Sequence, residues 1–326
     1  MKRLVGVAAV LAIVAAVLFL VPSDHYLFVP DPARPVDPLV RVPDEPTGSG
    51  TEGGVYMVDI LVRKANLLER IFPGLEEGAS LISGEQFNPT GTSDTQRRRE
   101  SLNEMSRSQE IAVTVALRNL GYDVEVDEQG AEVASVVPGN PAEGKLEAGD
   151  VIVEARGRPV ETRDDLLEIM EPVRPGQKVT LEVLRDERRT QVELGTKAAA
   201  DDPERAVFGI VVLQAAEFRF PLDIEIDAGD IGGPSAGLAF ALDVVDEVGE
   251  DIDRGRRIAV TGTLELDGTV RQIGGIKQKT IGARQADADL FLVPDENADE
   301  ARRHAKGLRI VAVSNFREAL SHLTTN

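Results

Sequence analysis

The sequence predicts a mixed α/β (α+β) protein with an apolar N-terminal helix, a small β-barrel module that carries one helix, and a C-terminal α/β domain. Three observations support this prediction. The chain has 326 residues, more than one domain of ordinary size needs. The run from Leu4 to Ser23 contains no charged residue. The rest of the chain has short β-branched segments, punctuated by glycine and proline, between stretches with helical spacing of apolar residues.

The composition excludes several classes of function. A formal net charge of −20 argues against nucleic acid as a partner, because binding to a phosphate backbone requires clustered lysine and arginine. The chain has no cysteine, which rules out disulfides, thiolate catalysis and cysteine-ligated zinc. We expect neither a metal nor a cofactor.

The first 53 residues predict a membrane attachment. As a helix, the run Leu4 to Ser23 would extend about 30 Å, enough to cross the hydrocarbon core. Lys2 and Arg3 precede it, so residues 1–23 are interpreted as a cytoplasmic tip and a single transmembrane anchor with the body outside the cytoplasm. A long signal sequence is the alternative, but the run lacks a small-residue cleavage site at its end. Residues 24–53, rich in proline, are predicted to form an extended stalk.

Residues 54–119 are predicted to form a strand and a long helix. The stretch from Val55 to Val62 is apolar and β-branched, as in a buried strand, and residues 95–120 show helical periodicity. The loop between them, residues 74–94, is rich in glycine and polar residues. The arginines at 97–99 are interpreted as a solvated face in preference to an anion site.

Residues 120–198 contain short strands, Gly/Pro turns and one capped helix, as in a small, partly open barrel. The order "GAEVASVVPGNPAEGKLEAGDVIVEARGRPVETRDDLLEIM" followed by "PGQKVTLEVLRD" resembles bacterial PDZ domains. The resemblance implies binding of extended peptides beside a sheet edge. It places the carboxylate-binding loop at Leu120-Gly121-Tyr122, with Leu166 or Leu167 lining the groove. Alternatively, these residues only end the long helix and fill the core.

Ser235 lies where a glycine-rich turn, Asp227 to Gly233, passes into an apolar helical stretch. Pro234 suits a first helical position. Free backbone N–H groups and the positive end of the helix dipole would favour both a nucleophile and the oxyanion formed on attack at a carbonyl. Simple helix capping is the alternative explanation.

A serine nucleophile requires a base, and the three histidines, His25, His304 and His322, lie in no motif-like setting. A lysine can act as a base near neutral pH only if its pKa is strongly lowered. Lys277 and Lys279 follow the glycine pair Gly274-Gly275 at an expected helix start. On a helix they point about 200° apart, and their neighbourhood alone does not choose between them.

Residues 205–326 resemble the proteolytic domain of Lon-type proteases (peptidase family S16). Three blocks carry the resemblance: "GGPSAGLAFAL", "IAVTGTLELDGTVRQIGGIKQKTIGA" and "ADLFLVPDEN". The resemblance implies that Ser235 is the nucleophile, that Lys279 is the general base and that Thr261 orients the lysine. Backbone amides from Gly233 to Ala236 would hold the oxyanion. Thr261 could also be only a strand residue.

The chain departs from the Lon pattern in two ways. Where the pattern has an acidic residue two positions before the proline, this chain has Gly232, with Asp230 nearby. No stretch matches the ATPase phosphate loop Gly-x-x-x-x-Gly-Lys-Ser/Thr. The resemblance is therefore to membrane-anchored PDZ–Lon-like proteins, in which peptide recognition replaces ATP-driven delivery.

Together these features predict a membrane-anchored serine endopeptidase that acts on peptides or unfolded extracytoplasmic proteins without ATP. One alternative is a PDZ adaptor with a degenerate Lon-like domain, and another is a protein that cuts only its own loop at 74–94. By analogy with Lon, a homo-oligomer such as a hexamer is expected. The strand at 55–62 could join the peptidase sheet, which would make the PDZ-like module an insertion into a split domain.

Overall fold

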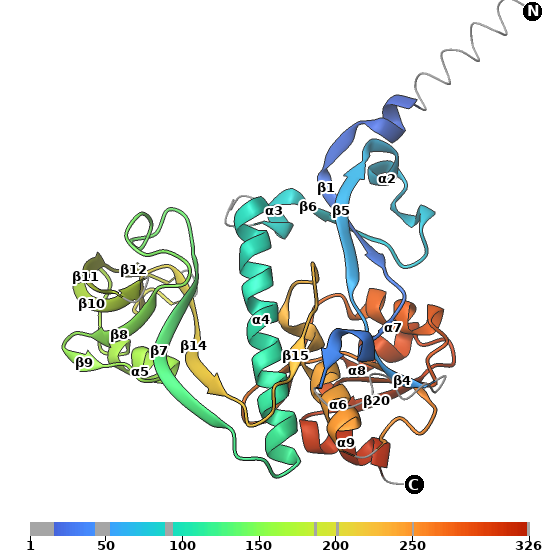
Figure 1. Cartoon of the computed structure of the whole chain (residues 1–326). Helices are drawn as coiled ribbons and strands as arrows, with labels where there is room; N and C mark the ends of the chain where they lie inside the picture. Colours follow the sequence, from blue (N-terminus) through green and yellow to red (C-terminus); the bar gives the residue numbers. More distant parts are fainter. Residues whose placement is uncertain are drawn as a thin grey trace, which may run out of the picture. The chain divides into compact units, whose positions relative to one another are not determined.

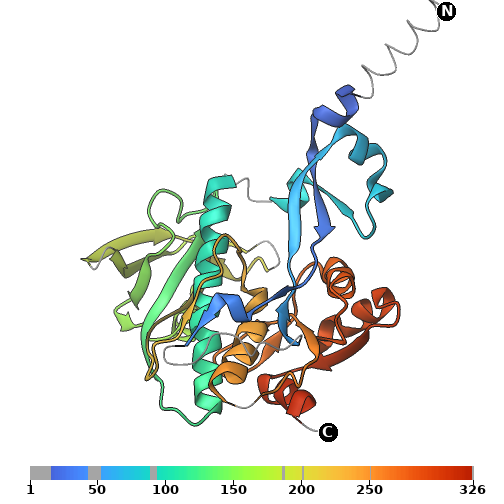
Figure 2. The ribbon, with the colours of Figure 1, turned by 45° about the vertical axis from the view of Figure 1, so that its right-hand side comes forward.

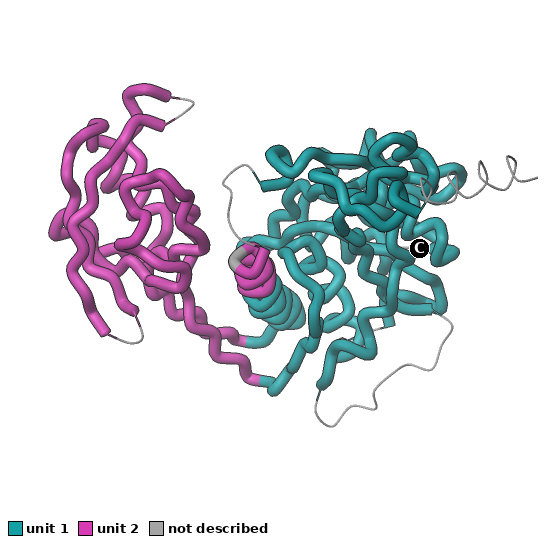
Figure 3. The backbone as a smooth tube through the Cα atoms, turned by 90° about the horizontal axis from the view of Figure 1, so that it is seen from above, with its two compact units in different colours: residues 1–89, 105–122, 222–326 teal, residues 90–104, 123–221 magenta. Residues whose placement is uncertain are grey.

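The computed structural model describes residues 16–42, 53–88, 94–185, 188–199, 202–249 and 251–324. The chain divides into two compact units (Figure 3). Unit 1 comprises residues 1–89, 105–122 and 222–326, and unit 2 comprises residues 90–104 and 123–221. Helix α4 (Asp94–Asn119) begins in unit 2 and continues into unit 1.

Unit 1 is built on a five-stranded sheet with helices packed against it (Figure 1). The strand order is β2-β4-β16-β19-β20, and all neighbours are parallel except β2 and β4. Its strands are β2 (Arg34–Pro35), β4 (Gly54–Met57), β16 (Arg257–Val260), β19 (Leu290–Pro294) and β20 (Arg309–Val313). Every residue of β19 is buried, as expected for a central parallel strand.

Four helices complete this part of unit 1: α6 (Gly237–Val248), α7 (Ile276–Gln285), α8 (Asp295–His304) and α9 (Phe316–Thr324). The core between the sheet and the helices α7 and α8 contains Ala259, Phe291 and Val293 from the strands, with Ala283 and Ala301 from the helices. Helix α6 packs against β4 and β16. Burial of these apolar faces fixes the helices that carry the residues discussed below.

A second, antiparallel sheet of unit 1 has the order β5-β1-β6. Its strands are β1 (Pro22–Pro30), β5 (Ile60–Asn66) and β6 (Ser80–Ser83), and they are accompanied by α2 (Leu67–Ile71), η2 (Pro73–Leu75) and α3 (Gly84–Phe87). In Figures 1 and 2, β1 and β5 run together as a long ribbon with α2 near its end. Unit 1 also contains the 3-10 helix η1 (Asp37–Leu39) and two two-stranded sheets, β3 (Val40–Arg41) with β15 (Glu225–Ile226) and β17 (Thr263–Leu264) with β18 (Val270–Arg271).

The prediction of an extended stalk over residues 24–53 is wrong for most of that segment. Residues 24–30 belong to β1, and residues 34–41 supply β2, η1 and β3. Pro30 and Pro35 lie at strand ends and Pro38 lies at the start of η1, where a missing N–H group is tolerated. The strand predicted from Val55 to Val62 is two strands, because β4 ends at Met57 and β5 begins at Ile60. Only β4 joins the sheet that contains β16.

The predicted membrane anchor lies mainly outside the described residues. Residues 16–20 are helical, and Pro22 already begins β1. Within the part of the chain that the structure describes, no helix is both long and apolar enough to span a membrane.

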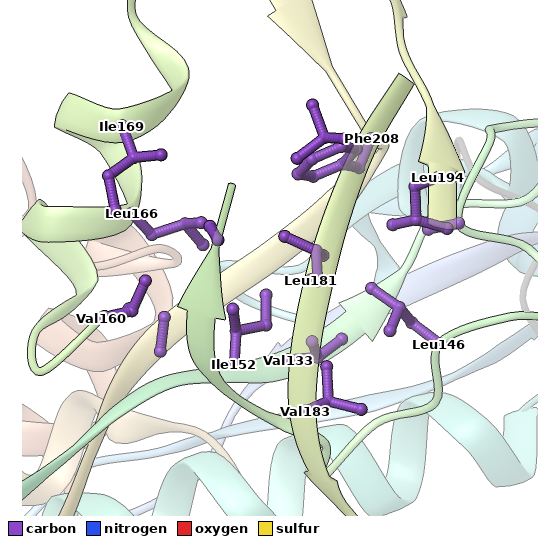
Figure 4. Close-up of a cluster of buried hydrophobic side chains, with 14 of the residues drawn as sticks. Val133, Leu146, Ile152, Val160, Leu166, Ile169, Leu181, Val183, Leu194 and Phe208 are labelled. Carbon is purple, nitrogen blue, oxygen red and sulfur yellow. The ribbon is translucent and has the colours of Figure 1, made fainter. Parts of the chain in front are cut away.

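Unit 2 contains a six-stranded antiparallel sheet, in which five strands have the order β11-β10-β8-β7-β14 and β9 pairs with β8, together with helix α5 (Arg163–Met170). Its strands are β7 (Glu125–Val136), β8 (Val151–Ala155), β10 (Lys178–Arg185), β11 (Arg188–Gly195) and β14 (Ile210–Arg219), with the short strands β9 (Arg158–Pro159), β12 (Lys197–Ala198) and β13 (Ala206–Val207). Ile152, Leu181 and Leu166 lie in its aliphatic core (Figure 4). Residues 205–221, predicted to begin the C-terminal domain, belong here because β14 pairs with β7 along its whole length.

Candidate active site

Ser235 lies in a short 3-10 helix, η3 (Pro234–Ala236), that leads directly into α6. Gly233 precedes it with φ of 87°, a conformation that glycine adopts without steric cost. Ser108 of α4 donates a hydrogen bond from Oγ to the carbonyl oxygen of Pro234 at 3.1 Å. A Cβ atom on Gly237 would lie 2.6 Å from that Oγ, so the close approach of the two helices requires glycine there.

Lys279 points from α7 toward Ser235. Its Nζ lies 2.7 Å from Ser235 Oγ, and its side chain is only 2% exposed. Lys277, two residues earlier, points elsewhere and donates from Nζ to the carbonyl oxygen of Ala79 at 3.3 Å. The structure therefore separates the two lysines that local sequence reasoning left unresolved, and it places Lys279 beside the serine.

Thr261, directly after β16, contacts both residues. Its Oγ1 accepts a hydrogen bond from Lys279 Nζ at 3.0 Å and donates one to the carbonyl oxygen of Ser235 at 3.1 Å. The N–H of Thr261 donates to the carbonyl oxygen of Leu292 in β19, so the sheet fixes its position. A fixed acceptor of this kind directs the lysine head group toward Ser235 Oγ.

Burial lowers the pKa of the Lys279 ammonium from 10.5 to about 8. The carboxylate of Asp59, which follows β4, opposes this by favouring the charged lysine. Asp59 itself pairs with Arg34 of β2. Asp31 lies 3.8 Å from the same guanidinium, and burial together with the neighbouring Asp59 raises the pKa of Asp31. Desolvation thus dominates, and it makes a neutral lysine accessible near physiological pH.

The other residues predicted for the site are Gly233 and Ala236, which flank Pro234 and Ser235, and Asp230 of the preceding turn. Gly233 caps η3 and Ala236 is buried within it. Pro234 has no N–H group, so within this stretch only the other amides can donate to an oxyanion. Asp230 is exposed.

Two residues near the serine were not found from the sequence. Asp59, which follows β4, acts on the charge of Lys279, and Ser108 of α4 donates to the carbonyl oxygen of Pro234. Both lie outside the three sequence blocks that resemble Lon-type proteases. Ser108 is a buried polar residue on the apolar face of α4. A serine among apolar helix positions is the local sequence signal that could have marked Ser108 as a candidate.

A pocket of about 630 Å³ lies in unit 2 between α5 and the chain that leads into β14. Leu167, Met170 and Arg174 line one side, and Phe208, Ile210 and Val212 line the other. Strand β14 is the last in the sheet order, so its outer edge carries no partner strand in the described part of the chain. A helix facing an open strand edge is the geometry that accepts an extended peptide as an added strand.

The loop Val207-Phe208-Gly209-Ile210 enters this pocket. The carbonyl oxygens of Phe208 and Gly209 accept hydrogen bonds from the N–H groups of Ala142 and Val137. The N–H groups of Phe208 and Gly209 donate to no acceptor within the described residues. Gly209 has φ of 80°, and a Cβ there would lie 2.1 Å from Asn140 Cβ. The loop therefore presents free amides at the pocket and requires glycine.

The predicted peptide-binding loop lies outside unit 2 and stays a prediction. Leu120, Gly121 and Tyr122 follow α4 in unit 1, and none of them lines the pocket. Of the predicted groove residues, Leu166 lines the pocket but is almost entirely buried in the core, whereas Leu167 is 54% exposed. An apolar–Phe–Gly–Ile pattern precedes the apolar strand β14, and it was not singled out from the sequence.

Three carboxylates in unit 1 form a cluster that could be considered for a metal ion. Oxygen atoms of Asp246, Asp251 and Asp253 lie within 4.8 Å of one another. Each carboxylate also accepts a hydrogen bond from a loop amide: Ile252 N–H to Asp246, Arg254 N–H to Asp251 and Gly255 N–H to Asp253. These bonds account for the cluster as a loop-stabilising arrangement.

Comparison with known families agrees with this geometry. Residues 119–196 match the PDZ domain model, and residues 219–326 match the model of the Lon protease (S16) C-terminal proteolytic domain. The chain contains a PDZ domain and a Lon-type proteolytic domain. Ser235, Thr261 and Lys279 all lie within the stretch matched by the Lon model.

Curated relatives are Lon proteases. "Lon protease 2" of Bacillus subtilis (strain 168) is 35% identical over 108 residues, 33% of this chain and 18% of that protein. "Lon protease" of Rhizobium meliloti (strain 1021) is 30% identical over 217 residues, 65% of this chain and 27% of that protein. The chain thus matches well under a third of the length of these relatives. Among solved structures, the PDZ domain of an SdrC-like protein from Listeria innocua is 23% identical, with a TM-score of 0.24, over 26% of this chain and 92% of that domain.

Proposed function

We propose that the chain is a membrane-anchored serine endopeptidase that uses a Ser235–Lys279 dyad and cleaves peptides or unfolded extracytoplasmic proteins without ATP. One observation carries the proposal. The amine of Lys279 lies 2.7 Å from Ser235 Oγ in a buried setting that lowers the lysine pKa to about 8. That distance is within the range for proton transfer between a nucleophile and its base.

The proton movements follow from this pair. Neutral Lys279 accepts the proton of Ser235 Oγ as Oγ bonds to the scissile carbonyl carbon. Backbone N–H groups at the start of η3 and α6 stabilise the oxyanion. The Lys279 ammonium then gives its proton to the leaving amine as the C–N bond breaks. Water attacks the acyl-enzyme, Lys279 takes a proton from that water, and the proton returns to Ser235 Oγ when the acid product leaves.

Thr261 acts as a positioning residue. Because its hydroxyl donates to the Ser235 carbonyl oxygen, its lone pair is free to accept from Lys279. This orientation favours one rotamer of a long, flexible side chain, which reduces the entropy lost when the dyad aligns.

Substrate would be bound in the PDZ pocket. An extended segment adding to the outer edge of β14 would place its end near the amides of Phe208 and Gly209, with apolar contacts from Met170 and Val212. Peptide capture of this kind would take the place of ATP-driven delivery, because no stretch of the chain matches the ATPase phosphate loop. Anchoring through residues 4–23 and assembly into a homo-oligomer are parts of the same proposal.

The test uses the full chain in detergent micelles, because β1, β2 and β3 lie within residues 22–41 and a truncated body would lack them. Wild type, Ser235→Ala and Lys279→Met are incubated with an unfolded protein, with and without ATP, and cleavage is followed by mass spectrometry. We expect wild type to cleave equally in both conditions and both variants to be inactive. Equal activity in all three, or cleavage only with ATP, would contradict the proposal. An inactive wild type that still binds peptides would favour the adaptor alternative.

A further inference from the structure

Exposed apolar side chains concentrate at one end of the β1–β5 ribbon. Of the eleven large apolar residues exposed in the described part of the chain, seven lie in two short segments there. We call this set the apolar tip, and it consists of Val17, Phe19, Leu20, Val21, Ile71, Phe72 and Leu75. Monomeric proteins rarely expose so many apolar groups together unless the surface contacts a partner or a membrane.

The two segments of the tip are joined although they lie 50 residues apart. Pro22 pairs with Asn66 at the end of the ribbon, and Leu67 N–H donates to the carbonyl oxygen of Val21 at 3.1 Å. Helix α2 therefore begins next to the end of the N-terminal helical segment. Figures 1 and 2 both show α2 beside the start of β1.

A polar framework holds the exposed side chains in place. Asn66 and Glu69 form a capping box at the start of α2. Arg63 binds Glu69 through two hydrogen bonds of 2.9 and 2.8 Å and also contacts Glu76 beyond η2. These bonds fix the turn on both sides of Phe72, so the apolar groups are displayed by an ordered element.

The position of the tip indicates which partner covers it. Residues 4–21, which lead into the tip, contain no charged side chain. Among the described residues near the tip, Arg70 pairs with Asp24 at 3.0 Å and Arg63 pairs with Glu69 at 2.8 Å, so these two arginines form no basic cluster for anionic headgroups. An apolar surface continuous with an apolar chain segment fits the boundary between acyl chains and headgroups.

We propose that Ile71, Phe72 and Leu75 insert into the membrane interface beside the N-terminal segment, giving the protein a second membrane contact. This inference rests on the membrane anchoring in the proposed function. Because β1 and β5 connect the tip to the rest of unit 1, two contacts would restrict tilting of the ribbon where a single helix would allow it.

The experiment uses the absence of cysteine, which lets one introduced thiol be labelled specifically. Full-length Leu75→Cys and Leu167→Cys, with 63% and 54% exposure of the native side chains, carry a bimane probe in phosphatidylcholine vesicles. Ala9→Cys reports on the predicted span. As a control, each labelled variant should have the same urea unfolding profile as wild type, which would show that the probe leaves the fold intact. Quenching is measured with lipids spin-labelled near the headgroup and with aqueous iodide.

We expect lipid quenching of the Leu75 probe at least twofold stronger than that of the Leu167 probe, and iodide quenching at least twofold weaker. Equal behaviour of these two probes would overturn the inference, and the Ala9 probe would show whether the anchor had failed as well. Iodide protection at Leu75 without lipid quenching would also overturn it, in favour of a second copy covering the tip.

Discussion

Replacing Lys279 by methionine removes the proposed base and keeps a side chain of similar length in its buried site. The pKa of about 8 lies about 2.5 below the ordinary lysine value of 10.5. At about 1.4 kcal/mol per pKa unit, burying the ammonium costs about 3 kcal/mol relative to the neutral amine. The same shift raises the neutral fraction at pH 7 from roughly 1 in 3000 to about 1 in 10, a gain of about 300-fold.

Two results follow for Lys279→Met. Cleavage should fall by roughly 10²–10⁴-fold, the usual contribution of a general base. The free energy of unfolding at pH 7 should rise by up to about 3 kcal/mol, because a buried ammonium is replaced by an apolar group. Between about pH 8 and 10.5 the unfolded wild type binds more protons than the folded one, so wild-type stability increases through this window and the difference from the variant shrinks.

Urea unfolding at pH 7 and pH 10, combined with cleavage assays, measures both effects. Retained cleavage by the variant would refute the assignment of Lys279 as base. A stability difference that is the same at both pH values would refute the argument that a buried ammonium is responsible. A matched control is Lys277→Met, which removes a lysine hydrogen-bonded to Ala79 and should leave cleavage within a few fold.

Three further predictions concern neighbouring groups. In wild type, the cleavage rate should rise with pH through an apparent pKa of about 8. Asp59→Asn should move this rise to lower pH, because Asp59 favours the charged lysine. If Asp59→Asn had the same pH profile as the exposed control Glu300→Gln, this expectation would be contradicted. Thr261→Val should lower kcat about tenfold, as expected for loss of a hydrogen bond to a charged group. Thr261→Ser keeps the hydroxyl and should largely retain kcat. An equal loss of kcat in both variants would show that packing of the threonine, and not its hydrogen bond, matters. Gly209→Ala should weaken binding of a fluorescent peptide at least tenfold, because its Cβ would collide with Asn140. The control Gly176→Ala has a similar φ of 88° and no atom within 4 Å of its Cβ, so it should bind as wild type does. Anisotropy titration measures both affinities, and equal affinity of the two variants would exclude the loop from binding.

The contact between Ser235 and Lys279 was predictable because its signals are local. Ser235 sits in a glycine-rich turn before an apolar helix, and Lys279 follows a glycine pair, so each lies in a short recognisable block. Neighbourhood alone did not distinguish Lys279 from Lys277, and the resemblance to Lon did. In the structure the distinction comes from α7, whose buried face includes Lys279. Asp59 was not predictable, because the approach of β4 to α7 depends on strand pairing between distant segments.

The errors have a common physical origin in long-range pairing. The proline content predicts a stalk for residues 24–30, yet Tyr26 to Phe28 pair with both β5 and β6. Similarly, residues 207–219 were assigned to the C-terminal domain, although β14 completes the sheet of unit 2 and provides one wall of its pocket. Local composition does not specify a strand's partner, because the pairing free energy depends on the neighbouring strand and on burial.

Labelling of Ser235 tests the central claim most directly. The full chain is treated with a fluorophosphonate, which reacts with activated serine hydroxyls, and the adduct is located by peptide mass spectrometry. We expect a single adduct on Ser235 that forms roughly tenfold faster at pH 9 than at pH 7, following the neutral fraction of a lysine with a pKa of about 8. Labelling should be at least 100-fold slower in Lys279→Met. No adduct on Ser235, or equal labelling rates in wild type and variant, would contradict a Ser–Lys dyad.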